Sequence, residues 1–164
     1  MNSPQYDPEY RSFTIEELSG VLADNADDVM AYFRRGNAYS NEREYALALE
    51  DLTAVLERVP DHVMARNNRG MAYLCLGRFE DALPDLTRAI ELNPQYRDAY
   101  HNRALALSEL GRLDEAIADM TQAIELDGAF WSAYRHRSMF YAMQGRHDES
   151  YRDFLQARDI GGES

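Results

Sequence analysis

Apolar and small residues recur along the chain with a period of 34 residues, from Val29 to the last residue. Each copy holds two stretches of helical hydrophobic period, separated by a glycine in three of the four copies. The eighth position of the four copies reads Gly36, Gly70, Ala104 and Ser138, and the twentieth reads Ala48, Ala82, Ala116 and Ser150. A small side chain leaves room for a large one on a neighbouring helix, so the pattern predicts stacked helix–turn–helix units.

Each copy is expected to form two antiparallel helices joined by a tight turn. The predicted helices cover residues 30–42, 44–58, 64–76, 78–92, 98–110, 112–126, 132–144 and 146–160. Gly77, Gly111 and Gly145 stand between the paired helices, where a left-handed backbone costs glycine little. The first copy has Arg43 at this place, and a positive φ there costs roughly 1 kcal/mol.

A further short helix precedes the first full copy. Thr14 and Glu17 form a capping-box pattern, and apolar residues follow at helical spacing over 15–22. These residues have the offsets of a second repeat helix, so we expect the segment to cap the N-terminal end of the stack. The expected organisation is an N-terminal arm (1–13), a capping helix with its connection (14–28), and four repeats (29–62, 63–96, 97–130 and 131–164).

Two charged positions are the same in every copy. The seventh position is arginine (Arg35, Arg69, Arg103, Arg137), and the 23rd is aspartate (Asp51, Asp85, Asp119, Asp153). The two positions stand level on antiparallel helices, where a guanidinium can bridge to a carboxylate. One interpretation is a row of ion pairs that fixes the register of the helices, and the other is anion binding by the arginines. The structural interpretation is favoured because each arginine has its own aspartate.

The period of 34 residues, with small residues at fixed offsets, resembles that of the tetratricopeptide repeat family. The resemblance covers the four copies. It implies an all-α, right-handed solenoid of four helix–turn–helix repeats, here with an N-terminal capping helix. It also implies a concave face, lined by the first helix of each pair, that binds a peptide or another protein.

The resemblance places the binding groove at positions two, five, six and nine of each copy, which vary between copies. The candidate groove residues are Phe33, Arg34, Asn37, Asn67, Asn68, Met71, His101, Asn102, Leu105, Arg135, His136 and Met139. An asparagine amide both donates and accepts, so Asn68 and Asn102 resemble a short asparagine ladder for an extended backbone. The alternative is that these are merely solvated polar side chains. His101 and His136 lie about one repeat apart and are expected to approach one another.

Composition excludes several functions. A net charge of −12 and a pI of about 4.7 disfavour binding to nucleic acid or an anionic membrane. All 17 basic residues are arginine, which removes the lysine of a Walker phosphate loop and of a pyridoxal Schiff base. The single Cys75 excludes an internal disulfide, and no catalytic or metal-ligand spacing is present. We expect a cytoplasmic protein without enzyme activity, cofactor or metal, because neither a signal peptide nor a membrane span is evident.

Two functions remain. The first is an adaptor that binds an extended peptide or partner segment in the groove. The groove's arginines and histidines favour acidic residues or a C-terminal carboxylate. The dicarboxylate clamp of certain co-chaperones is not expected, because Phe33, Asp98 and Asn102 replace three of its five residues.

The second function is a scaffold that associates with itself through the last repeat. There Arg158 replaces an apolar residue, and Tyr151, Phe154 and Leu155 are expected to be exposed.

Overall fold

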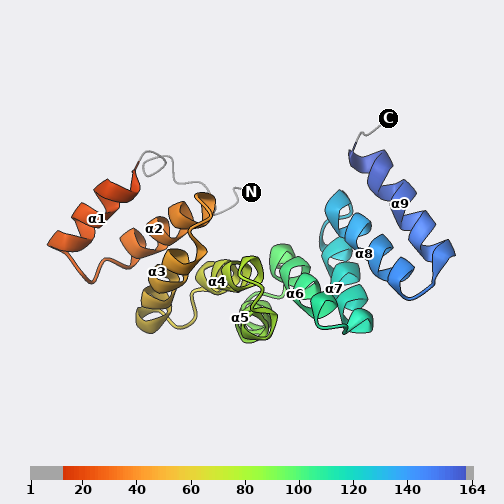
Figure 1. Ribbon diagram of the computed structural model, residues 1–164, viewed down its shortest axis with the longest axis horizontal. Coiled ribbons are helices and arrows are strands. Elements are labelled where there is room, and N and C mark those ends of the chain that lie inside the picture. Colours follow the sequence, from red (N-terminus) through yellow and green to blue (C-terminus); the bar gives the residue numbers. More distant parts are fainter. Residues whose placement is uncertain (1–12, 162–164) are drawn as a thin grey trace. The chain divides into compact units, whose positions relative to one another are not determined.

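The computed structural model describes residues 13–161, which fold into nine α-helices (Figure 1). They are α1 (Ile15–Asp24), α2 (Val29–Asn41), α3 (Tyr45–Arg58), α4 (Val63–Cys75), α5 (Phe79–Leu92), α6 (Arg97–Glu109), α7 (Leu113–Leu126), α8 (Trp131–Met143) and α9 (His147–Gly161). Each end lies within one residue of its predicted position. Residues 1–12 of the expected N-terminal arm lie outside the described residues.

Side-chain caps fix where several helices begin. The Thr14 hydroxyl accepts from the Glu17 N–H, and the Glu17 carboxylate accepts from the Thr14 N–H, so the predicted capping box is confirmed. The Asp28 carboxylate accepts from the Ala31 N–H at 2.9 Å, and His62 Nδ1 accepts from the Ala65 N–H at 3.1 Å. These caps fix the first residues of α2 and α4, whereas α6 and α8 begin at the same position of their copies without a side-chain cap.

The four tight turns inside the repeats all contain a residue with positive φ. Gly77, Gly111 and Gly145 have φ values of 70°, 74° and 74°, and Arg43 has 64°, as predicted. Arg43 therefore adopts a conformation that glycine adopts at lower cost. Pro84 occupies the second turn of α5, where its missing N–H removes one helical hydrogen bond.

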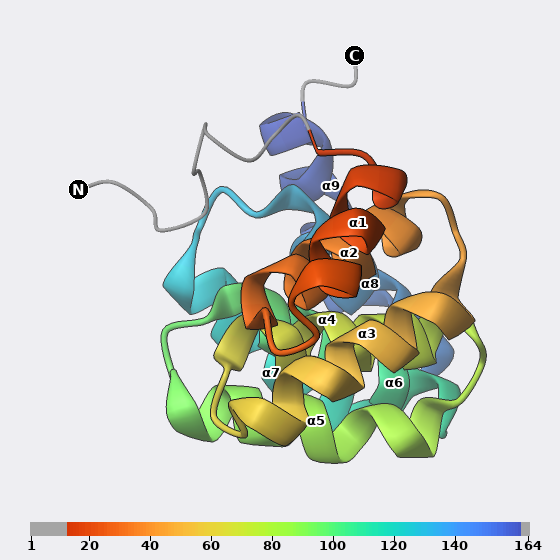
Figure 2. The ribbon, with the colours of Figure 1, turned by 90° about the vertical axis from the view of Figure 1, so that its left-hand side faces the viewer.

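The described chain forms two compact units that meet at Pro60 and Asp61. In the first unit, α1 packs on α2 and α2 packs on α3 (Figures 1 and 2). Leu18 and Leu22 of α1 form a buried cluster with Ala31 of α2, as a capping helix requires. At the eighth position of the first repeat, a Cβ placed on Gly36 would lie 3.1 Å from Leu52 Cγ, so the two helices approach closely.

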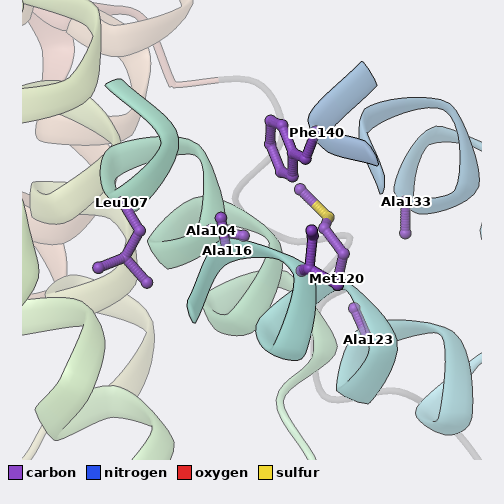
Figure 3. Close-up of a cluster of buried hydrophobic side chains, with 8 residues drawn as sticks. Ala104, Leu107, Ala116, Met120, Ala123, Ala133 and Phe140 are labelled. Carbon is purple, nitrogen blue, oxygen red and sulfur yellow. The ribbon is translucent and has the colours of Figure 1, made fainter. Parts of the chain in front are cut away.

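The second unit consists of three helical hairpins, α4–α5, α6–α7 and α8–α9, packed in sequence (Figure 1). Its largest core cluster lies between the second and third hairpins. Met120 of α7 extends toward Phe140 of α8, and small residues on both helices surround the contact (Figure 3). Met120 and Phe140 are completely buried, so this cluster holds the third and fourth repeats together.

Ion pairs join the two helices of every hairpin through the repeated Arg and Asp positions. Each arginine donates from Nε and Nη2 to both carboxylate oxygens of its aspartate. The pairs are Arg35–Asp51, Arg69–Asp85, Arg103–Asp119 and Arg137–Asp153, with N···O distances of 2.6–3.0 Å. The four aspartates are buried, at 3–8% exposure. The structural interpretation of the row is therefore confirmed, and we call it the Arg–Asp row.

The last helix leaves apolar side chains uncovered. Phe154 of α9 stands at the offset of Leu86 and Met120, which are completely buried, yet it is 53% exposed. Met120 is covered by the first helix of the next repeat, and no repeat follows α9 in the described chain. Tyr151 is 63% exposed and Arg158 is exposed, so the predicted exposure is confirmed for Tyr151 and Phe154, whereas Leu155 is half-buried.

Candidate functional site

The first helices of the three hairpins in the second unit present a face whose residues differ from copy to copy. We call it the first-helix face and define it by nine predicted groove residues: Asn67, Asn68, Met71, His101, Asn102, Leu105, Arg135, His136 and Met139. They lie on α4, α6 and α8. Helix α4 packs directly against α6, which brings the first two groups together.

Three asparagine side chains on α4 and α6 form one hydrogen-bonded chain. Asn102 Nδ2 of α6 donates to Asn67 Oδ1 of α4 at 2.9 Å, and Asn67 Nδ2 donates to Asn68 Oδ1 at 3.1 Å. Asn67 is only 4% exposed, so its amide is used within the protein. Asn68 and Asn102 are half-buried, at the outer ends of the chain. An amide has two N–H groups and an oxygen with two lone pairs, so Asn102 keeps further hydrogen-bonding capacity.

Two histidines connect α6 to α8. His101 Nε2 lies 3.2 Å from His136 Nδ1, and the ring centroids are 5.0 Å apart. The expected approach of these two residues is thus confirmed. A hydrogen bond between ring nitrogens needs one N–H and one lone pair, so at least one of the two rings is neutral. Phe130, in the connection before α8, packs on the His101 ring at a centroid distance of 5.1 Å.

Burial keeps the histidine pair neutral. Desolvation is the main cause that lowers the pKa of His101 to about 4, and the neighbouring His136 lowers it further. Desolvation also lowers the pKa of His136, and the Arg135 cation acts in the same direction. Because both protonated forms are disfavoured, the pair carries no charge at neutral pH.

The charged groups around the pair differ in whether they have partners. Arg97 donates to the carboxylates of Asp98 and Asp127 and lies over the Phe130 ring at 4.1 Å. Arg135, by contrast, is exposed and forms no ion pair or side-chain hydrogen bond with any residue of 13–161. Every other arginine of the second unit donates to a carboxylate or, for Arg152, to a backbone carbonyl. Arg135 is therefore a cation that remains available to a ligand.

The remaining predicted groove residues divide into exposed and packed groups. Met139 is 49% exposed, whereas Leu105 packs against the main core cluster and Met71 is half-buried. Phe33, Arg34 and Asn37 lie on α2 of the other unit, and Phe33 is only 7% exposed. Phe33 and Asn67 thus offer little surface to a ligand in this structure, because a groove position can also face a neighbouring helix.

Sequence reasoning missed two groups of residues. Phe130 ends the third copy, where the second copy has Tyr96, and this repeated aromatic position was a signal for it. A Ser/Thr row also recurs with the period of 34: Ser19, Thr53, Thr87 and Thr121. Arg35, Arg103 and Arg137 each use their third nitrogen, Nη1, to donate to Ser19, Thr87 and Thr121 of the preceding second helix, at 2.9–3.2 Å. The Arg–Asp row thus also connects α1 to the hairpin of the first unit, and successive hairpins of the second unit.

An open hollow of about 430 Å³ lies beside the Arg–Asp row, away from the first-helix face. Its lining includes Thr87, Arg103 and Asp119, which already bond to one another. Within residues 13–161, no three potential metal-ligating side chains (His, Cys, Asp or Glu) come together. The helices of the same part of the chain are all too short or too polar to cross a bilayer.

These features define an α-helical repeat scaffold, in which stacked hairpins build a surface rather than a catalytic cleft. The tetratricopeptide repeat model matches the sequence three times, at residues 33–97, 70–129 and 101–162. The chain belongs to the tetratricopeptide repeat family, a class of protein-interaction scaffold, and no catalytic family is indicated. No curated protein is significantly similar to the chain in sequence.

Solved structures support the same assignment. A crystal structure of MamA matches with a TM-score of 0.85 and 26% identity over 91% of this chain and 87% of that one. A MamA fragment from Desulfovibrio magneticus RS-1 gives a TM-score of 0.85 at 22% identity, covering 92% and 85% of the two chains. YrrB, described as a TPR protein with an unusual peptide-binding site, gives 0.79 at 23% identity, covering 91% and 77%. The predicted all-α solenoid of the tetratricopeptide type is confirmed.

Proposed function

We propose that the chain is a protein-interaction adaptor whose first-helix face binds an extended peptide segment of a partner. The observation that carries the proposal is the asparagine chain joining α4 to α6, continued by the histidine pair joining α6 to α8. Asn68 and Asn102 share a position that holds Arg34 and His136 in the other two copies, and the fifth position differs in every copy, so the stacking does not require one residue type there. Amide and imidazole groups lined up across three helices suit the alternating N–H and C=O groups of an extended backbone.

The partner we propose carries acidic residues or a C-terminal carboxylate near α8. The chain as a whole is strongly acidic, yet this end of the face holds an arginine without a carboxylate partner, Arg135. A partner of opposite local charge gains electrostatic complementarity there. Met139, exposed next to this region, adds an adaptable apolar contact.

A peptide selection tests this function. Peptides selected on the wild-type chain from a random library are measured for affinity against the Asn68→Ala/Asn102→Ala variant. Loss of hydrogen bonds to two amides predicts binding weaker by about tenfold or more. The matched control is Gln95→Ala/Gln156→Ala, which removes two exposed amides of the second unit away from the first-helix face. Equal affinity of both double variants and the wild type would show that the peptides bind elsewhere.

A second candidate function rests on the exposed end of α9. Phe154 and Tyr151 form an apolar surface where an internal repeat would bury its counterparts. We propose, as the alternative, a scaffold in which this surface associates with a second copy. Sedimentation over a wide concentration range tests it: association should occur in the wild type and disappear in Tyr151→Ser/Phe154→Ser. A wild-type monomer at the highest concentration eliminates this candidate.

A further inference from the structure

The end of the first-helix face at α8 combines an unpaired cation with a pair of neutral bases. Arg135 and His136 are consecutive residues, and the Arg135 cation is close enough to disfavour the protonation of His136. His136 in turn lies against His101 at 3.2 Å. Building on the proposed function, we infer that this corner is a carboxylate subsite. A carboxylate of the bound partner lies against Arg135 and the histidine pair, and its binding brings one proton from solvent onto the pair.

The geometry of the pair permits one added proton. With both rings neutral, one nitrogen donates and the other accepts. After one proton is added, an imidazolium donates to the remaining neutral ring, so the contact is kept and becomes charge-assisted. A second proton would set two N–H groups against each other at 3.2 Å and break the contact. The pair therefore takes up at most one proton without separating α6 from α8 at this point.

The charges around the histidine pair explain why a ligand carboxylate must bind before the pair can take up a proton. On α6, Arg97 and Asp98 face His101, and Asp127 of the connection before α8 is held by Arg97. On α8, Arg135 faces His136, and α4 contributes only the neutral Asn67 through its bond to Asn102. The two aspartates are thus engaged by Arg97, and nothing in this part of the described chain offsets Arg135. An added proton is unfavourable until an anion arrives, and a bound carboxylate supplies that anion.

A carboxylate fits this corner better than a phosphate group. Phosphate recognition by proteins generally uses several arginines around one anion. Here a single arginine is available, since Arg97 and Arg137 already bond to aspartates. One guanidinium and one imidazolium provide donors for the two oxygens of a carboxylate.

The test uses the full-length, isotope-labelled chain and two peptides. The probe is acetyl-Ala-Glu-Ala-Glu-Ala-Glu-Ala-amide, and its control has glutamine in place of glutamate. The imidazole resonances are followed by NMR between about pH 5.5 and about pH 8, the range where a histidine switches charge. Without peptide the pair should stay neutral over this range, and with the glutamate peptide its apparent pKa should rise into the range. The imidazole resonances of His147, exposed at the start of α9, should be the same with and without the peptide and serve as an internal reference.

Two variants assign the effect to this corner. Arg135→Gln should reduce the shift and weaken binding of the glutamate peptide by about tenfold. Arg152→Gln, which removes an exposed arginine of α9, should change neither. His101→Gln/His136→Gln should bind the glutamate peptide with an affinity independent of pH over the same range.

The inference is overturned if the glutamate peptide does not bind. It is also overturned if the peptide shifts all histidines equally, or if the glutamine peptide shifts the pair as strongly. Backbone amide resonances separate this failure from failure of the proposed function. If both peptides perturb Asn68 and Asn102 alike and the pair keeps its pKa, the face binds peptides and the carboxylate subsite is wrong.

Discussion

Two sets of polar side chains lie next to each other on the first helices of the second unit. The Arg–Asp row uses Arg103 and Arg137, whereas the first-helix face uses Asn102 and His136, the residues immediately before them. Consecutive helical residues point about 100° apart. One therefore faces the second helix of its own hairpin, and the other faces the first helix of the neighbouring hairpin. Neighbouring positions on the same helix therefore make two different kinds of contact, one within a hairpin and one between hairpins.

The two sets differ in how uniform they are. Every aspartate of the Arg–Asp row is buried and bound by two nitrogens of its own arginine, with the same geometry in all four copies. The first-helix face uses amides at one junction and imidazoles at the next. Identical interactions in every copy indicate that the stack requires them. Hydrogen-bonded side chains that change from copy to copy are not held constant by the stack, which is why we propose that they recognise a ligand.

The largest expected effect is on the Arg–Asp row. Asp119→Ala should lower the free energy of unfolding by about 3 kcal/mol, because it leaves the Arg103 guanidinium without its carboxylate in a mostly buried site. The guanidinium then keeps only its hydrogen bond to Thr87. The Arg103 side chain is 22% exposed, so water can hydrate it and reduce the loss of stability. An arginine side chain stays protonated in proteins, so the Arg103 guanidinium of the variant cannot relieve the unpaired charge by losing its proton. Urea denaturation measures the change.

The control for this prediction lies on the same helix. Glu115 pairs with Arg112 on the surface, where both side chains are about half exposed. Glu115→Ala should lower the free energy of unfolding far less than Asp119→Ala, since exposed ion pairs contribute little. Similar losses for the two variants would mean that the repeated pairs do not hold the hairpins together.

The next largest effect is a pH dependence of folding stability that comes from the first-helix face and not from the Arg–Asp row. The folded pKa of His101 is lowered to about 4, mainly by desolvation, whereas an unfolded histidine titrates near 6.5. The neutral ring therefore stabilises the fold fully above about pH 6.5, and this contribution is lost as the pH falls toward about 4. The loss amounts to at most about 3 kcal/mol. His101→Gln, which keeps a polar group beside His136, should lose less stability than the wild type over this interval.

The comparison requires stability curves of both proteins from neutral pH to about pH 4.5. Other groups titrate in the same interval, including His62, whose pKa is lowered mainly by desolvation where it caps α4. Their contributions are shared by wild type and variant, so only the difference between the curves reports on His101. Parallel curves would contradict the prediction.

Most of the fold could be predicted from the sequence because the same physical constraints recur four times. Each positive-φ turn, each arginine–aspartate pair and each small residue at a close approach is one sample of a common geometry. A single Gly77 would be ambiguous, but Gly77, Gly111 and Gly145 at equal spacing identify the turn. The replacement of an apolar residue by Arg158 could also be recognised from the sequence, because the other three copies have an apolar residue at this offset.

The candidate site could be predicted only as a set of positions. Residues such as Asn67 and Arg135 stand at a position whose residue changes in every copy, so no repeated counterpart fixes where their side chains point. The sequence therefore did not show that Asn67 is buried between its neighbours, or that Arg135 lacks a carboxylate partner. These properties depend on contacts between helices of successive repeats, which a one-dimensional pattern does not contain.

The smallest effect concerns the eighth position, which belongs to the repeated set although it carries no charge. A Cβ on Gly70 would lie 2.6 Å from Leu86 Cγ, and Leu86 is completely buried, so the side chain has no space to move. Overpacking of this kind costs about 1–3 kcal/mol, and alanine returns up to about 1 kcal/mol through its helix propensity. Gly70→Ala should therefore destabilise the chain by about 1 kcal/mol in urea denaturation.

Gly20 of α1 is the matched control, because a Cβ there meets nothing within 4 Å. Gly20→Ala has the propensity gain without the overpacking, so it should stabilise the chain by up to about 1 kcal/mol. The two alanine substitutions are chemically identical, and their opposite signs would isolate the contribution of helix approach. If Gly70→Ala were neutral or stabilising, the hairpin could open without cost at its closest contact. Close packing would then not explain the small residue at this position, and the eighth position would leave the set that the stack requires.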